Sequence, residues 1–314
     1  GVHPHHAREW SEAKLAELRK LAETPRVVAI GEIGLDYHYN HASRAVQRRA
    51  FREQLALARE MEMPVSIHCR EAYEDLFEDL REEKAGELGG AIHCFSGEYE
   101  DAARLVDLGF YLGVGGTMTF PNAGPLRDAI KKIGIDYLTL ETDAPYLAPQ
   151  PKRGRRNEPA HLPYTARDLA ELTGHGYRDT ARATRYNTQR AFRLSCDVEP
   201  QVVYIWEGRI YINLTNDCTN DCEFCHKFGE GVMRGVNVRL DAEPSEEAIL
   251  AAAVSPNYEC YNEVVFSGLG EPTMRFDLLL RVARKLRDLG KRIVLETNGQ
   301  AQLYHQESVI AQIE

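Results

Sequence analysis

The sequence predicts an α/β protein made of two modules, the first of them a parallel β/α barrel. Through residues 1–194, short apolar runs alternate with amphipathic stretches. Such alternation implies a parallel sheet with right-handed crossovers. The same alternation resumes after a short polar segment that ends in a proline, SCDVEP. With 314 residues, the chain is long enough for two domains.

The first module is predicted element by element from the periodicity of its apolar residues. Buried strands are expected at residues 27–32, 64–68, 90–94, 110–114 and 137–142. Helices are expected between them at residues 12–23, 43–60, 73–84, 98–108 and 124–132. With the opening GVHPH taken as the tail of an earlier strand, six strands are identifiable. Barrels of eight such units take about 250 residues, so we expect a (β/α)8 TIM barrel that lacks its first strand unit.

The second module begins after a linker at residues 195–201 and is expected to span residues 202–314. Two β-rich runs, at 201–206 and 209–214, flank a Glu-Gly pair and predict a hairpin. A strand at 264–270, a helix at 276–289 and a strand at 292–296 follow. The chain starts without a methionine and stops within this alternating pattern, so we expect it to be truncated at both ends.

Composition and charge exclude some classes of protein. No apolar run approaches the length that a bilayer needs, and no signal peptide is visible, so no membrane contact is expected. The seven cysteines are an odd number, which favours a reducing cytoplasm over secretion. The net charge is −10, yet residues 152–193 hold 10 basic and 4 acidic residues. That segment either contacts phosphate groups or forms solvated helix faces.

Polar side chains follow four of the predicted strands, at the end where barrel enzymes place their chemistry. Glu32, His68, His93 and Asp143 close the runs VVAIGE, PVSIH, GGAIH and LTLETD. Carboxylate and imidazole groups are ligands of divalent metals, and one such histidine alone would more often be a satisfied core residue. Four of them at successive strand ends predict a shared metal site suited to hydrolysis.

The motifs of this module resemble those of the TatD family of metal-dependent deoxyribonucleases, in that family's order. The matching stretches are GVHPH, IGEIGLDY, PVSIHCREA, AIHCFSG, LETDAPYL and RRNEPAHLPYTA. The resemblance implies an amidohydrolase-type barrel that hydrolyses DNA, single-stranded or at ends, with one or two Mg, Mn or Zn ions.

The resemblance also assigns roles to residues. It makes Glu32, His68, His93 and Asp143 metal ligands, with Glu32 and Asp143 catalytic, and Asp143 orienting or deprotonating the attacking water. It places His3 in the pocket, and Arg156 and Asn157 in a loop near the scissile phosphate. The family begins with a strand that carries a His-x-His metal-binding pair, which this sequence lacks, because GVHPH matches the second strand. Four of six expected ligands are therefore present.

Cys218, Cys222 and Cys225 are spaced CxxxCxxC in the segment LTNDCTNDCEFC. Three thiolates on one loop suit a metal or an iron–sulfur cluster and leave one position open. A zinc knuckle is the alternative, but zinc prefers a fourth protein ligand at a familiar spacing.

This spacing, with Phe224 before the last cysteine, resembles the signature of the radical S-adenosylmethionine (SAM) superfamily. The later stretches EVVFSGLGEPT and ETNG support the resemblance. It implies a [4Fe–4S] cluster on the three cysteines and a reductant that supplies it with electrons. SAM would bind the open iron beside Phe224, Gly268, Gly270, Glu271 and Asn298, and its cleavage would give a 5′-deoxyadenosyl radical.

The chain as a whole resembles a TatD-linked radical SAM protein and is therefore expected to be a bifunctional cytoplasmic enzyme. Two other functions remain open for the first module. It could hydrolyse another ester or amide, or it could be a non-catalytic binding domain that serves the radical SAM module. The radical's substrate and the oligomeric state are not encoded in any recognisable pattern.

Overall fold

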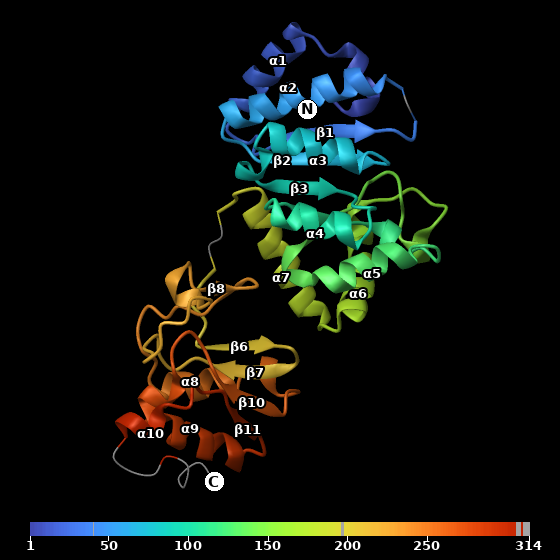
Figure 1. The fold of residues 1–314 in the computed structure, drawn as a ribbon. Helices are drawn as coiled ribbons and strands as arrows, with labels where there is room; N and C mark the ends of the chain where they lie inside the picture. Colours follow the sequence, from blue (N-terminus) through green and yellow to red (C-terminus); the bar gives the residue numbers. More distant parts are fainter. Residues whose placement is uncertain (40, 196–197, 306–308, 310–314) are drawn as a thin grey trace. The chain divides into compact units, whose positions relative to one another are not determined.

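The computed structural model describes residues 1–39, 41–195, 198–305 and 309 (Figure 1). Packing divides the chain into two compact units, Gly1–Cys196 and Asp197–Glu314. Residues 196 and 197, in the predicted linker, lie outside the described residues. Among the described residues, no helix has the length and apolar character required to span a membrane.

The first unit is built on a parallel sheet of five strands in the order β1-β2-β3-β4-β5. Every neighbouring pair is parallel, and His68 in β2 lies directly beside His93 in β3. Within the described residues no ladder joins β1 to β5, so the sheet is barrel-like but open. The strands are β1 Ile30–Asp36, β2 Val65–Arg70, β3 Gly90–His93, β4 Tyr111–Val114 and β5 Leu138–Leu140.

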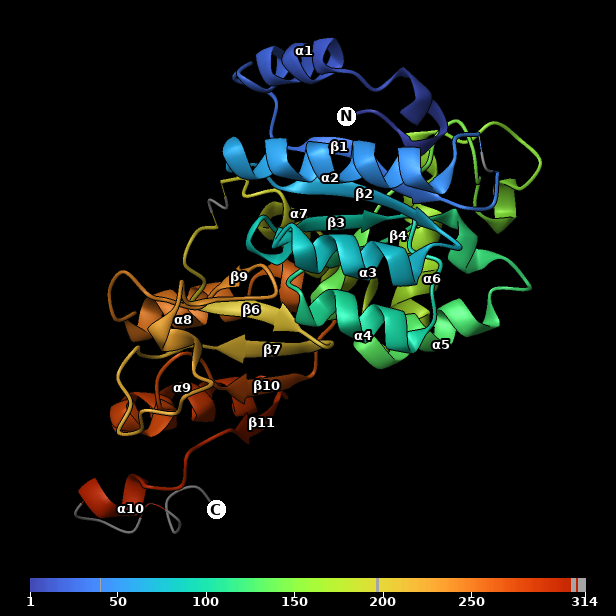
Figure 2. The same cartoon turned by 45° about the horizontal axis from the view of Figure 1, so that its top comes forward.

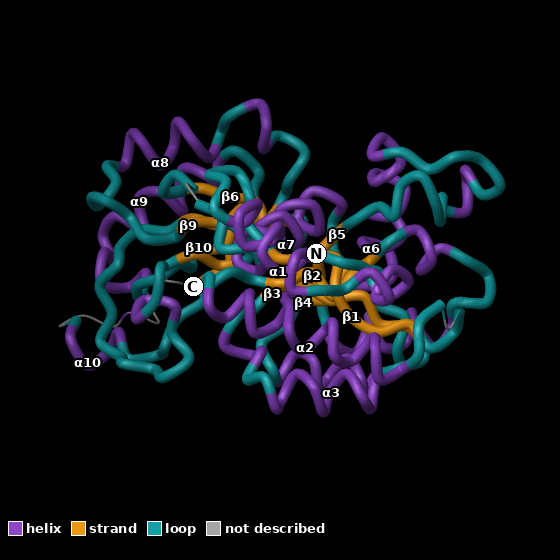
Figure 3. The backbone as a smooth tube through the Cα atoms, turned by 90° about the horizontal axis from the view of Figure 1, so that it is seen from above, coloured by secondary structure: helices purple, strands orange, loops and turns teal. Residues whose placement is uncertain are grey.

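Helices follow the strands as the periodicity predicted. Figure 2 shows α2, α3 and α4 side by side along the sheet, and Figure 3 shows α2 and α3 along one side of the strands. Phe51 and Phe77 on these helices are fully buried against the sheet, each burial being worth roughly 1.5–3 kcal/mol. The helices are α1 Glu12–Ala22, α2 Arg44–Glu60, α3 Tyr73–Glu82, α4 Tyr99–Asp107, α5 Gly124–Ile133, α6 Leu162–Thr173 and α7 Tyr177–Ala191.

Two sequence predictions for this unit were wrong. GVHPH is not a strand tail, because Pro4–Glu9 forms a 3-10 helix whose first turn tolerates Pro4 and is capped by the His3 ring. Five strands rather than six are therefore present among the described residues of the unit. The first predicted strand is also displaced, since β1 runs on to Asp36 instead of ending at Glu32.

Gly34 explains how β1 can continue. Its φ is +140°, and a Cβ at this position would lie 2.0 Å from the His68 carbonyl oxygen. Glycine alone allows this approach of β1 to β2. Gly34 pairs with His68 in the register, so Glu32 and Asp36 fall on either side of that histidine.

The second unit holds a four-stranded sheet in the order β11-β10-β7-β6. The hairpin prediction is confirmed, because β6 and β7 are antiparallel around Glu207 and Gly208, both at positive φ. Strands β7, β10 and β11 are parallel. The elements are β6 Val203–Trp206, β7 Arg209–Ile212, β8 Val232–Met233, β9 Val236–Asn237, α8 Glu246–Ala253, β10 Glu263–Phe266, α9 Phe276–Asp288, β11 Arg292–Leu295 and α10 Ala301–Tyr304.

Candidate metal centre and cysteine loop

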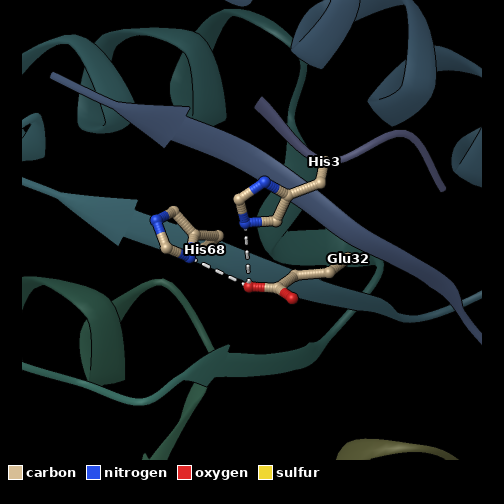
Figure 4. Close-up of side chains that lie close together, drawn as sticks. All are labelled: His3, Glu32 and His68. Carbon is tan, nitrogen blue, oxygen red and sulfur yellow. Dashed lines mark hydrogen bonds and ion pairs between the residues drawn. The ribbon is translucent and has the colours of Figure 1, made fainter. Parts of the chain in front are cut away.

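The carboxyl ends of the first unit's strands gather a cluster of imidazoles and carboxylates. Candidate ligand atoms of His3, Glu32 and His68 all lie within 4.8 Å of one another (Figure 4). Glu32 Oε1 is 2.9 Å from His68 Nδ1 and 3.6 Å from His3 Nε2. His93 Nε2 lies 4.0 Å from Glu32 Oε1 and 3.7 Å from Asp143 Oδ1. The structure thus brings together all five predicted residues, which lie far apart in the sequence.

Two further carboxylates orient the histidines, and the sequence analysis missed both. Asp36, 1% exposed, places Oδ2 3.1 Å from His68 Nε2. Glu141 Oε2 lies 3.0 Å from His93 Nδ1, while its Oε1 accepts the Cys94 backbone N–H at 2.7 Å. A carboxylate that holds one ring N–H of a histidine leaves the other nitrogen free as a ligand. His68 would therefore present Nδ1, and His93 would present Nε2.

A pattern was available that could have revealed Asp36 and Glu141. Asp36 lies four residues after Glu32, and Glu141 lies two residues before Asp143. Alternate residues of an extended chain share one face, so the even spacing predicts that both carboxylates of each pair turn to the same side, although Glu141 and Asp143 follow the end of β5 at Leu140.

The geometry of the cluster fits a cation. Glu32 Oε1 and Asp36 Oδ2 face the two ring nitrogens of His68, so a neutral ring can donate to only one of the two carboxylates. A second proton on the ring, or a cation at the other nitrogen, satisfies both carboxylates. For His93, burial opposes charge, but hydrogen bonds to Asp143 and Glu141 raise the pKa to about 10.

His3 fits a different role. Its Nδ1 accepts the His5 backbone N–H at 3.2 Å, so the neutral ring carries its proton on Nε2, which faces Glu32. Burial, and then the neighbouring His68, lower the pKa of His3 to about 4, which favours this neutral form. The neutral His3 ring would therefore direct an N–H donor at Glu32, while its ligand atoms also belong to the group that could hold a metal ion.

The two residues of the loop predicted to contact the phosphate differ in their surroundings. Arg156 is exposed and forms no ion pair or hydrogen bond with any residue that the structure describes. Asn157 is buried, donates from Nδ2 to the Tyr146 carbonyl at 2.7 Å, and accepts the Glu158 N–H at Oδ1. The side chain of Asn157 fixes the loop to the segment that follows Asp143, whereas Arg156 is free to meet a ligand.

In the second unit, the three cysteines occupy the loop after β7. Although all three are described, their sulfurs are not gathered within the 4.8 Å that gathers His3, Glu32 and His68. Phe224, beside Cys225, is 87% exposed.

The predicted SAM-site glycines bring two loops together. A Cβ on Gly268 would lie 2.1 Å from Asn213 Oδ1, and one on Gly270 would lie 2.4 Å from the Asp217 carbonyl oxygen. Gly270 N also donates to the Thr215 carbonyl at 3.0 Å. Both glycines therefore let the loop after β10 pack on the residues that lead into the cysteines.

Glu271 is buried, being only 3% exposed, and its carboxylate forms hydrogen bonds that join two loops. Its Oε1 accepts from Thr273 Oγ1 at 2.6 Å and from Thr297 Oγ1 at 2.8 Å, and its Oε2 accepts from Asn298 N at 2.7 Å. Asn298 Nδ2 in turn donates to Thr219 Oγ1 at 3.0 Å and lies 3.8 Å from Cys218 Sγ. The carboxylate thus holds the Thr-Asn-Gly loop against the cysteine loop.

Matches to known families divide the chain near the boundary between its two compact units. Residues 1–193 match the family described as TatD related DNase, and residues 212–308 match the Radical SAM superfamily. The first stretch is 43% identical over 195 residues to the uncharacterized metal-dependent hydrolase YabD of Bacillus subtilis, covering 62% of this chain and 76% of that protein. It is also 43% identical over 201 residues to the 3'-5' ssDNA/RNA exonuclease TatD of Pantoea vagans, covering 62% and 77%.

A solved structure shares the fold of the first unit. The TatD homolog YjjV of Escherichia coli K12 superposes with a TM-score of 0.57 at 34% identity, covering 62% of this chain and 76% of that one. With the family match, these similarities confirm the resemblances drawn from the motifs. The chain belongs to the TatD-related DNase family through residues 1–193, and a radical SAM domain follows at residues 212–308.

Proposed function

We propose that residues 1–194 form a divalent-metal-dependent phosphodiesterase that cleaves single-stranded DNA or DNA ends, joined by residues 195–201 to a radical SAM module at residues 202–314. The observation that carries the hydrolase proposal is the convergence of Glu32, His68, His93 and Asp143 at one edge of the sheet. A relative is named a 3'-5' ssDNA/RNA exonuclease, which supports nucleic acid as the substrate class.

The residues of the centre would have different roles in hydrolysis. A divalent cation held there would lower the pKa of a water molecule and polarise a phosphoryl oxygen. One or two such ions, of Mg, Mn or Zn, would be held by Glu32, His68, His93 and Asp143. Asp143 also orients the attacking water and accepts its proton.

Groups around the centre would bind the substrate. The Nε2–H of His3 can donate to a phosphate oxygen, and the Arg156 guanidinium can hold two such oxygens at once. These donors would be worth most in the transition state, where negative charge develops on the phosphoryl oxygens.

For the second module we propose a [4Fe–4S] cluster on Cys218, Cys222 and Cys225, with SAM bound beside Phe224, Gly268, Gly270, Glu271 and Asn298. The cluster and SAM would supply radical chemistry, while the protein aims it. The hydrogen bonds of Glu271 to Thr297 and Asn298 suit a site in which the loops are positioned before the cofactor binds. The reductant and the radical's substrate are partners of this module.

The hydrolase is tested by release of nucleotides from a labelled single-stranded oligonucleotide with Mg²⁺, Mn²⁺ or Zn²⁺. Chelation should abolish release, and Asp143→Asn should lower kcat by about a hundredfold or more, because the variant loses both a charged metal ligand and the group that accepts the proton of the water. Turnover of a small ester or amide without nucleotide release would favour the alternative hydrolase. Absence of any turnover, with oligonucleotide still bound, would favour the binding-domain alternative.

The cluster is tested by anaerobic reconstitution with iron and sulfide. We expect about four irons and visible charge-transfer absorbance, both lost in Cys222→Ala. Zinc in place of iron, with no change in Cys222→Ala, would contradict the cluster. A matched control is Cys260→Ala, since this exposed cysteine lies outside the loop.

A further inference from the structure

We propose that Tyr39 and His41 form an aromatic shelf beside the metal centre that stacks on an unpaired base of a single-stranded nucleic acid. The inference rests on the proposed phosphodiesterase function and names the part of the substrate that the site would recognise. Both residues lie in the loop that follows β1.

The structure separates the aromatic residues of this loop by their surroundings. Tyr37 is 7% exposed, its hydroxyl donates to Asp75 Oδ2 at 2.5 Å, and it lies under the Arg44 guanidinium. Tyr37 therefore belongs to the packed interior. Tyr39 is 53% exposed, and His41 is exposed as well. Residues that only close the barrel would be covered, as Tyr37 is.

The two exposed rings stack on each other, so an unpaired base would extend a stack that already exists. Their centroids are 5.6 Å apart, and their planes are inclined by only 13°. The ring of His5 meets both edge-on, at 5.4 Å from Tyr39 and 4.8 Å from His41. The Arg70 guanidinium lies 4.9 Å from the Tyr39 centroid. Aromatic rings and guanidinium planes are the groups on which unpaired bases stack.

The shelf is tied to the metal centre through Asp36. Asp36 Oδ1 accepts the Tyr39 backbone N–H at 3.0 Å, while its Oδ2 contacts both His5 at 2.8 Å and His68 at 3.1 Å. The His3 and His5 rings are 4.4 Å apart, so one ring separates the shelf from the pocket donor.

A hollow next to the shelf offers space and a positively charged arginine for the phosphate backbone of the same nucleic-acid strand. Its volume is about 410 Å³, and His5, His6, Arg8, Glu9 and His41 line it. Arg8 is exposed and pairs with no acidic group in the part of the chain that the structure describes. An arginine free of internal partners can bind a phosphate bidentately. A base in a duplex already stacks on its neighbours, so the shelf should favour single strands.

The test combines a protein change with a substrate change. Wild-type protein, Tyr39→Ala and His41→Ala are each assayed with a single-stranded oligonucleotide and with the same oligonucleotide carrying an abasic site near its cleaved end. We expect Tyr39→Ala and the abasic site each to lower kcat/KM by roughly five- to hundredfold. Combined, they should lower it no further than either alone, because both remove the same contact. Tyr39→Phe should keep wild-type behaviour.

Tyr137→Ala is the matched control, since Tyr137 is also an exposed tyrosine of the first unit but lies before β5. Effects of Tyr39→Ala and the abasic site that multiply, or a Tyr39→Ala variant that cleaves like the wild type, would overturn the shelf. Fluorescence anisotropy with both oligonucleotides in EDTA repeats the comparison without hydrolysis. If the wild type releases no nucleotides, the phosphodiesterase proposal fails, and the anisotropy measurement still decides whether Tyr39 binds the base.

Discussion

Asp36 and Glu32 hold the two ring nitrogens of His68 from opposite sides, Asp36 Oδ2 at 3.1 Å from Nε2 and Glu32 Oε1 at 2.9 Å from Nδ1. The arrangement depends on Gly34, which brings β1 close enough to β2 for both carboxylates to reach one imidazole. Asp36 is thus a positioning residue, and Glu32 faces the nitrogen that remains for a metal.

Asp36→Asn should weaken binding of Mn²⁺ or Zn²⁺ by about ten- to hundredfold, because the amide no longer fixes the tautomer of His68. Isothermal titration calorimetry of the metal-free protein measures this loss directly, without reference to activity. Asp128→Asn serves as a control, since Asp128 is exposed on α5 and lacks hydrogen-bond partners among the described residues. Unchanged metal affinity in Asp36→Asn would show that His68 needs no such partner.

His3→Ala should leave metal affinity within about threefold of wild type and yet lower kcat/KM for an oligonucleotide by about ten- to hundredfold. The reason is that Nε2 of His3 carries its proton and can donate to a charged phosphate. His68→Ala, by contrast, should lose metal binding itself. Titration calorimetry and steady-state kinetics on the two variants separate these roles. Loss of metal affinity in His3→Ala comparable to that in His68→Ala would make His3 a ligand instead.

Sequence reasoning located the metal centre because its signals are local. Apolar runs followed by His68 or His93 mark the carboxyl ends of parallel strands, and the ends of neighbouring strands must meet. It missed Asp36 and Glu141 because each lies in a motif with another acidic residue. Which carboxylate faces the pocket depends on where a strand ends, and the unusual backbone at Gly34 moved that point by four residues.

The second unit shows the same limit for buried polar residues. Spacing identifies the cysteine loop, but it does not reveal what holds the loop in place. The motif predicts that Glu271 lies beside SAM, whereas the structure shows a carboxylate whose oxygens both accept hydrogen bonds from Thr297 and Asn298. Those donors lie 26 and 27 residues away in the chain, so only tertiary packing reveals them.

Glu271→Gln should destabilise the second unit by about 2–4 kcal/mol, since an amide nitrogen would replace an oxygen that now accepts a backbone N–H. Denaturant unfolding, followed by fluorescence of Trp206 on β6, reports on this unit. The same variant should retain less iron after reconstitution, because the Asn298 loop loses its anchor to Thr219 and Cys218.

Glu259→Gln controls for the loss of charge alone, as Glu259 is exposed in the same unit. Exchange of backbone amides around residues 297–300 in the cluster-free chain should accelerate in Glu271→Gln and stay unchanged in Glu259→Gln. Normal exchange together with weakened SAM binding would instead make Glu271 a direct ligand of SAM.

Gly268→Ala should prevent the loop after β10 from packing on the cysteine loop. The new methyl group would meet Asn213 Oδ1 at 2.1 Å, and Asn213 is itself buried with its Nδ2 bonded to the Val238 carbonyl. The shifts of backbone and side chains that relieve such an overlap typically lower the free energy of unfolding by about 1–3 kcal/mol. Gly229→Ala is the matched control, because its Cβ would make an ordinary contact of 3.8 Å with the His226 carbonyl oxygen. We expect reconstituted iron to fall in Gly268→Ala and to be retained in Gly229→Ala, and equal iron content in both would show that close packing of the two loops is not needed for the cluster.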